Sequence, residues 1–552
     1  MRKLLCIILL LVMAVTALTA CGAKPQPSSD SQESTTDAQQ TSTTEAPADP
    51  KAPITFTMFN NDISFGQPVW EKEIIAQEIT KKTGVTVDIT LPLSDDGQKI
   101  NLMLASGEKL TDFIYAQDPR SLVVKKLIEG KFVNSLDELM EKHAPDFAKS
   151  AWIVKNRPYF EQADGKIYFL AGLGLDMSRY GDGVEMPHYA GIGRREDIWE
   201  ELGMMPMTTP DELEAFLLKV KETHKEITHP LLLTYPNNYS IAWNGVLTNY
   251  YAFGGKGNYY QDGATKYFIR DPKFLESVMF LNRLYSKGLI NISTFTDNVD
   301  AQNSRVAEAK VAVYMGGIYK GSSNEAQAKK VVPTLKYRVF DMPTKPGETF
   351  KVPGMEICGS GSKCLFITKD CKDPARAIKF FEWLASEEGQ SIAAAGREGI
   401  DWKYTDYKGK KVIEPIGYFK ENYYNSDVMS KEYGYNKYAW AGFNYASAQV
   451  SWGNALSDEE QLRRNEMRAK TAGDNSIYDG TAPAVGSEEG VALVKIEDLI
   501  KTYVPKIVLA KNTSEAEEAY RELISKADGF GLAKVEAAVD VKYKENVAKR
   551  GK

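Results

Sequence analysis

The stretch ITFTMFNND, residues 54–62, begins the pattern that decides the fold class. Its first five residues alternate apolar and polar side chains, as a half-buried strand does. VTVDI at 85–89 alternates in the same way, and DFIY at 112–115 predicts a third strand. Helical periodicity fills the segments between them, at 68–84 and 100–107. This order predicts an α/β fold with a parallel sheet covered by helices.

The same pattern continues to about residue 405. Residues 311–315 and 364–367 are predicted as buried strands, and prolines at 210, 272 and 374 begin predicted helices. A chain of 552 residues exceeds what one hydrophobic core holds, so two or more lobes are expected.

The first twenty residues are typical of a secretory signal. Arg2 and Lys3 precede an apolar run that ends in small residues before Cys21. This arrangement resembles the signal of bacterial lipoproteins, which implies cleavage before Cys21 and acyl chains on that cysteine. The alternative is ordinary secretion with an unmodified cysteine. Residues 21–52 lack large apolar side chains after the cysteine and are predicted to form a disordered tether.

The composition limits the classes of molecule that the protein is expected to bind. The net charge of −6 argues against nucleic acid and against anionic lipid as the main partner, and no later apolar run reaches membrane-spanning length. Cys358, Cys364 and Cys371 follow the signal, and the sequence leaves their pairing open. The histidines are scattered, so neither a structural zinc site nor a cofactor is expected, and calcium binding stays open.

Several sequence runs together resemble one protein family. The runs are LASG at 104–107 with TDFI at 111–114, RREDIWEELG at 194–203, FLNRLYSKGLI at 280–290, and residues 311–324 and 375–396. In this order they resemble the extracellular solute-binding proteins of bacterial ABC importers, in the long lipoprotein form of the maltodextrin-binding-like sugar-binding group.

The resemblance implies two α/β lobes joined by hinge crossovers, with the ligand in the cleft between them. The implied parts are a signal at 1–20, a tether at 21–52, lobe 1 at 53–170 and 356–405, lobe 2 at 171–355, and an aromatic-rich, helical segment at 406–552 that lies mainly with lobe 2. The implied function is the capture of a carbohydrate, an oligosaccharide, for the transmembrane subunits of an ABC permease. The protein is expected to be an extracytoplasmic monomer, held at the membrane by its lipid alone.

The resemblance also implies ligand-binding residues, because sugars are held by carboxylates, amides and flat aromatic rings. These residues are Asn60, Asp62, Asp118, Tyr239, Trp243, Tyr319, Asp401, Trp402 and Trp440. For each polar residue the alternative is a turn or helix cap, and for each aromatic residue it is the core.

Two other functions stay open. A secreted carbohydrate-active enzyme needs two carboxylates that flank the scissile bond, and no such pair or catalytic motif stands out. No catalytic residue is therefore assigned. The same fold with a peptide ligand would need a paired Asp and Arg for the peptide termini.

Overall fold

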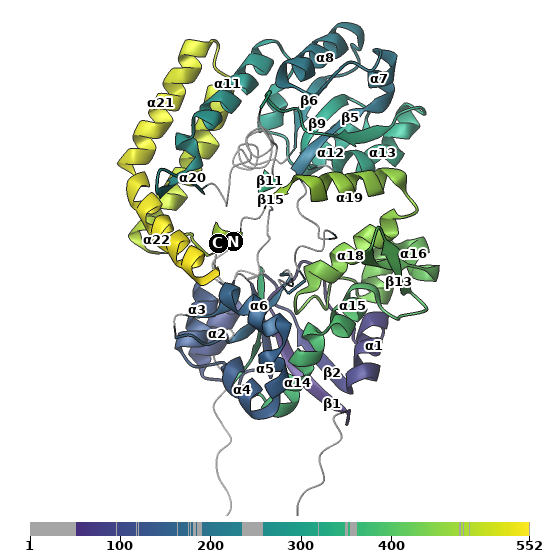
Figure 1. Cartoon of the computed structure of the whole chain (residues 1–552), viewed down its shortest axis with the longest axis vertical. Coiled ribbons are helices and arrows are strands. Elements are labelled where there is room, and N and C mark those ends of the chain that lie inside the picture. Colours follow the sequence, from purple (N-terminus) through teal and green to yellow (C-terminus); the bar gives the residue numbers. More distant parts are fainter. Residues whose placement is uncertain are drawn as a thin grey trace, which may run out of the picture. The chain divides into compact units, whose positions relative to one another are not determined.

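The computed structural model describes residues 51–550, except 95–96, 118, 120, 163, 175, 177, 180–183, 185–189, 235–257, 318, 348–351, 354–361, 474–475, 479 and 485. The described chain folds around two principal sheets, each with its own buried core (Figure 1). We call the sheet that contains β1, together with its helices, the first lobe. The other principal sheet with its helices is the second lobe.

The first-lobe sheet has the strand order β2-β1-β3-β12-β4. Its strands are β1 (Ile54–Asn60), β2 (Val85–Thr90), β3 (Phe113–Gln117), β4 (Phe169–Gly172) and β12 (Lys363–Ile367). β1 runs parallel to β2 and β3, whereas β12 is antiparallel to β3 and β4. The carboxyl ends of β1 and β3 therefore lie at the same edge, where Asn60 pairs with Tyr115.

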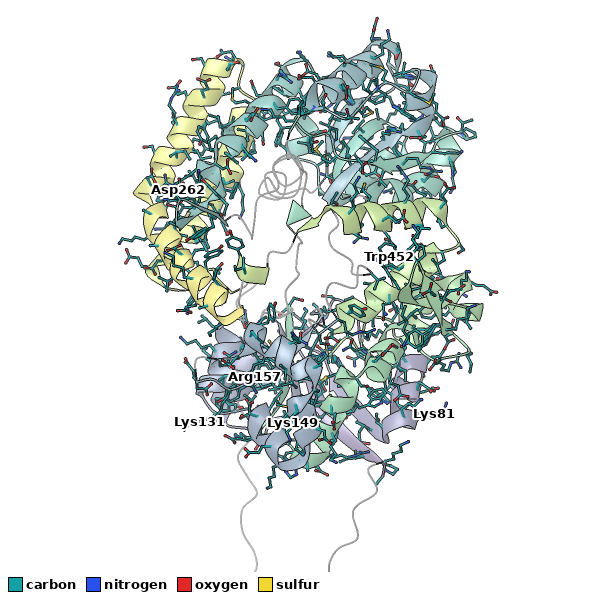
Figure 2. The ribbon with its side chains drawn as sticks, viewed as in Figure 1. Lys81, Lys131, Lys149, Arg157, Asp262 and Trp452 are labelled. Carbon is teal, nitrogen blue, oxygen red and sulfur yellow. The ribbon has the colours of Figure 1, made fainter. Side chains whose placement is uncertain are left out.

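Helices pack around this sheet and against one another, and in Figure 1 α1 and α14 lie beside the sheet. They are α1 (Ile74–Thr83), α2 (Gln98–Ser106), α3 (Leu122–Glu129), α4 (Leu136–His143), α5 (Pro145–Lys149), α6 (Ala151–Phe160), α14 (Pro374–Ala385) and α15 (Glu387–Ala395). Figure 2 labels Lys81 of α1, Lys149 of α5 and Lys131 in the turn after α3. All three side chains are exposed, so their ammonium groups stay in water.

The second-lobe sheet has the order β10-β5-β9-β6, with β5 (Ala190–Arg195), β6 (His229–Leu233), β9 (Val311–Gly317) and β10 (Tyr337–Phe340). Alternate side chains of β6 face opposite ways. Leu231 and Leu233 pack with Phe216 of α8 (Pro210–Thr223), and Leu232 packs with Tyr314 on the other face. Both faces of this sheet are therefore covered.

Further helices and short strands complete the described chain. The helices are α7 (Glu196–Glu201), α11 (Pro272–Ser286), α12 (Val299–Ala307), α13 (Tyr319–Val331), α16 (Gly417–Asn422), α17 (Ser426–Val428), α18 (Phe443–Ala455), α19 (Glu459–Thr471), α20 (Glu488–Val508), α21 (Thr513–Gly529) and α22 (Leu532–Arg550). Paired short strands are β7 (Asn258–Gln261) with β8 (Ala264–Tyr267), β13 (Trp402–Tyr407) with β14 (Lys410–Pro415), and β11 (Val352–Pro353) with β15 (Ala472–Gly473). Within the described residues, no helix combines the length and the apolar character needed to cross a bilayer.

The segment 406–552, expected to lie mainly with the second lobe, divides its buried side chains between the two cores. Phe419, Tyr433 and Trp440 belong to the first-lobe core, whereas Ile496 and Leu523 belong to the second-lobe core. Trp452 of α18, labelled in Figure 2, joins a separate small cluster and packs against Tyr407.

The predicted strands at 54–58, 85–89, 112–115, 311–315 and 364–367 are confirmed as β1, β2, β3, β9 and β12. The helix expected from residue 68 begins later, at Ile74. Residues 69–73 instead form a turn in which the backbone N–H groups of Lys72 and Glu73 both bond to the Val69 carbonyl. This turn places the Glu73 side chain in the first-lobe interior.

The amino end of α19 is joined to the edge strand β10 through Glu460. Its Oε1 accepts a hydrogen bond from the Val339 N–H at 3.1 Å, and Arg338 Nε lies 3.6 Å from its Oε2. Burial raises the pKa of the Glu460 carboxyl above its ordinary 4.5, although these neighbours oppose the shift. The folded state therefore binds this proton more tightly than the unfolded chain does.

It follows that the contribution of Glu460 to stability is fullest below pH 4.5 and falls as the pH rises through the raised pKa. We expect Glu460→Gln to remove this fall, so that the variant gains stability relative to the wild type as the pH rises. Urea unfolding across that pH range measures the effect. Glu459→Gln, at an exposed neighbouring position, is the control, and parallel pH profiles of wild type and Glu460→Gln would contradict the expectation.

Candidate functional site

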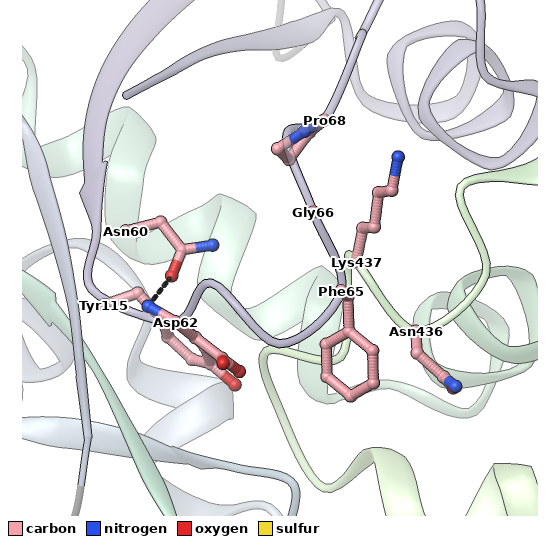
Figure 3. Close-up of a pocket in the computed structure, with 8 residues that line it drawn as sticks. All are labelled: Asn60, Asp62, Phe65, Gly66, Pro68, Tyr115, Asn436 and Lys437. Atoms are coloured by element: carbon pink, nitrogen blue, oxygen red, sulfur yellow. Dashed lines mark hydrogen bonds between the residues drawn. The ribbon is translucent and has the colours of Figure 1, made fainter. Parts of the chain in front are cut away.

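A small pocket lies beside the carboxyl end of β1 (Figure 3). It is lined by Asn60, Asp62, Phe65, Gly66, Pro68, Tyr115, Asn436 and Lys437. The space between these atoms is about 260 Å³, part of it open solvent, but the centre of a water molecule can reach only about 10 Å³. The enclosed part therefore has room for roughly one water-sized group.

Asn60 and Asp62 are placed by the end of the strand. Asn60 Oδ1 accepts a hydrogen bond from the Asp62 N–H at 2.8 Å, and Asp62 Oδ1 accepts one from the Ser64 N–H at 3.0 Å. Lys363, the first residue of β12, brings its Nζ to 3.1 Å from Asp62 Oδ2. Both predicted residues are thus held at the pocket, and both also shape the turn after β1.

The opposite wall comes from residues 434–438. Lys437 Nζ lies 2.6 Å from Glu73 Oε1 and donates a hydrogen bond to the Gln67 carbonyl at 3.1 Å. The Tyr438 hydroxyl donates to the other Glu73 oxygen. The Glu73 side chain is fully buried, so this cluster fixes the wall against the first-lobe core.

Tyr115 joins the two walls. Its hydroxyl donates a hydrogen bond to the Ala439 carbonyl at 2.9 Å. Burial, assisted by the negative charge of Asp62, raises the pKa of the Tyr115 phenol well above its ordinary value. The phenol therefore stays neutral and keeps its donor role throughout the physiological pH range.

Asp401 and Trp402 lie outside this pocket. The Asp401 carboxylate receives the Arg397 guanidinium at 2.7 and 3.0 Å and the Tyr433 hydroxyl at 2.8 Å. The Trp402 indole donates to the Gly396 carbonyl at 2.9 Å. Both side chains are buried, and these contacts hold the turn before β13.

Trp440 also lies within the first-lobe core. Its ring stacks on Trp70 at 6.1 Å and meets Tyr438 edge-on at 5.5 Å. Its exposed fraction is 1 %, and its buried indole N–H has no acceptor among the described residues.

The remaining predicted residues are not described. Asp118, Tyr239, Trp243 and Cys21 lie outside the described residues, as does the side chain of Tyr319. Among the side chains that are described, no group of three or more His, Cys, Asp or Glu is placed to hold a metal ion. Of the nine predicted ligand residues, the pocket brings together Asn60 and Asp62.

Sequence reasoning missed Glu73, Lys437 and Lys363. Glu73 and Lys437 are 364 positions apart, and nothing in the local pattern of either links the two. Lys363 is the first residue of β12 and directly precedes the apolar run 364–367, so the sequence indicates a strand-end residue rather than a partner for Asp62.

Comparison with known proteins identifies the family. The model described as "Bacterial extracellular solute-binding protein" matches residues 66–391. The fructooligosaccharide ABC transporter substrate-binding protein FusA of Streptococcus pneumoniae serotype 4 is 25% identical over 350 residues, which are 59% of this chain and 60% of that protein. The match thus spans about three fifths of this curated relative.

Solved structures share the fold over most of the chain. An HMO binding ABC-transporter associated solute binding protein from Bifidobacterium longum infantis has a TM-score of 0.64 at 15% identity, over 89% of this chain and 98% of that chain. FusA from S. pneumoniae, in complex with kestose, has a TM-score of 0.61 at 16% identity, over 90% of this chain and 100% of that chain. At these identities the likeness establishes the fold, which confirms the predicted two-lobed α/β class. Because the family model matches more than half of this chain, the chain belongs to the bacterial extracellular solute-binding protein family.

Proposed function

We propose that the protein is the substrate-binding receptor of an ABC transporter, which captures an oligosaccharide and delivers it to the transmembrane subunits of a permease. The observation that carries this proposal is the family membership together with the relative named as a fructooligosaccharide ABC transporter substrate-binding protein. The pocket supports it, because Asn60 and Asp62 present an amide and a carboxylate of the kind that bind sugar hydroxyls. In this role the protein releases its ligand chemically unchanged.

The proposal includes a lipid anchor at Cys21 and an extracytoplasmic location. The supporting observations are the apolar run before Cys21 and the polar tether after it. Metabolic labelling with a radioactive fatty acid tests the anchor, with Cys21→Ser as the control that should lose the label.

A neutral oligosaccharide that binds is expected to stabilise the folded protein by about 2.7 kcal/mol at a hundredfold excess over its Kd. A thermal-shift screen against fructo-, malto- and galacto-oligosaccharides measures this as a rise in Tm. Product analysis of the same mixtures checks that the sugar is unchanged. Turnover of the sugar, or the absence of any shift across the panel, would contradict the receptor proposal.

We further expect ligand binding to shift the protein toward a closed state, because contacts made by both lobes exist only in that state. Small-angle X-ray scattering should then show a smaller radius of gyration at saturating ligand than without it. An unchanged radius at saturation would contradict hinge closure.

A further inference from the structure

We propose that the pocket beside β1 receives one neutral hydroxyl group of the ligand and rejects a carboxylate, so that the receptor prefers neutral to acidic sugars. This inference rests on the proposed carbohydrate-binding function. It concerns the chemistry that the described pocket residues leave available to a ligand.

The charges at the pocket are already paired within the protein. The Asp62 carboxylate is ion-paired with Lys363, with side chains 3% and 10% exposed. Lys437, the cation among the lining residues, is ion-paired with Glu73, with side chains 6% and 1% exposed. Among the described residues, a carboxylate on the ligand would therefore find no uncompensated cation at the pocket to offset its loss of water.

The polar groups of the pocket that can still form hydrogen bonds suit a hydroxyl group of the ligand. Because Asn60 Oδ1 accepts from the Asp62 N–H, the orientation of the Asn60 amide is fixed and its Nδ2 is the outward group. This nitrogen has no acceptor among the described residues, and Figure 3 shows it turned toward the Gly66 side of the pocket. Among the described residues, each oxygen of Asp62 has one polar contact, and each can accept another hydrogen bond.

A hydroxyl can accept from Asn60 Nδ2 and donate to Asp62 at the same time. A ligand carboxylate can only accept, so it cannot use Asp62, and its charge would face another negative charge in a confined space. With room for roughly one water-sized group, a hydroxyl fits, whereas a carboxylate that keeps its bound water does not.

The test measures the Kd of the full chain by calorimetry for neutral fructo- and malto-oligosaccharides and for the same sugars with their primary hydroxyls oxidised to carboxylates. We expect the neutral form to bind at least about tenfold more tightly, a difference of about 1.4 kcal/mol. Asp62→Asn keeps the shape and removes the charge, and it leaves Lys363 free to pair with a ligand carboxylate. The preference for the neutral form should therefore shrink or reverse in this variant.

Asp427→Asn is the matched control, because Asp427 forms an ion pair with Lys431 that is largely exposed. It should leave the preference unchanged. A second variant, Asn60→Asp, keeps the bond to the Asp62 N–H and replaces the donor by an oxygen. This variant should bind the neutral sugar about tenfold more weakly.

The outcomes separate the inference from the proposed function. Equal binding of neutral and oxidised sugars by the wild type overturns the inference and leaves the receptor proposal standing. A preference unchanged in Asp62→Asn, or neutral-sugar affinity unchanged in Asn60→Asp, also overturns it. Failure of every neutral and acidic sugar to bind overturns both.

Discussion

Replacing Glu73 with alanine is expected to lower the free energy of unfolding by about 3–5 kcal/mol, because it leaves the Lys437 ammonium buried without its counter-charge. Lys437 Nζ lies 2.6 Å from Glu73 Oε1, and their side chains are 6% and 1% exposed. The Tyr438 hydroxyl loses its acceptor in the same variant. Guanidinium unfolding, followed by tryptophan fluorescence, measures the loss.

Two controls separate the buried charge from general damage. The double variant Glu73→Met with Lys437→Met removes both charges, and should recover much of the stability lost in Glu73→Ala. Asp427→Ala breaks the exposed pair with Lys431 and should cost about 1 kcal/mol or less. A loss below about 1 kcal/mol in Glu73→Ala would show that this pair does not hold the 434–438 wall in place.

Loss of the Glu73–Lys437 ion pair should also alter the pocket. Gly434 and Asn436 both have a left-handed backbone, with φ of 70° and 67°, so the wall follows a course that most residues resist. A Cβ at Gly434 would lie 2.4 Å from Glu73 Oε2. The buried cluster and the glycine therefore depend on each other, and loss of either one should displace the wall of the pocket.

The strands could be predicted because their alternation is local. In residues 54–58 and 85–89 the alternation of apolar and polar side chains indicates which of them are buried, since every second side chain packs in the core. The start of α1 could not be predicted, because it depends on a turn in which two N–H groups share the Val69 carbonyl. The sequence pattern between residues 68 and 73 does not distinguish this turn from a first helical turn.

The same distinction holds for the site. The position of Asn60 and Asp62 at the pocket could be predicted, because residues that follow a strand of a parallel sheet lie at the carboxyl edge of that sheet. The ion pairs that neutralise the pocket join the turn after β1 to β12, and the segment before α1 to the wall at 434–438. These contacts span hundreds of residues and arise only once the sheet and the aromatic-rich segment are packed together.

The packing of Trp440 favours a role in the core over a role in ligand binding. We expect Trp440→Ala to lower the free energy of unfolding by about 3–5 kcal/mol without any ligand present, because it empties a site packed against Trp70 and Tyr438. Trp440→Phe should lose less, since it keeps a ring and removes an indole N–H that is buried without an acceptor among the described residues. Tyr424→Ala, at a position 72% exposed, is the control and should cost about 1 kcal/mol or less. If Trp440→Ala instead unfolds like the wild type but binds sugar about tenfold more weakly, the ring serves the ligand rather than the core.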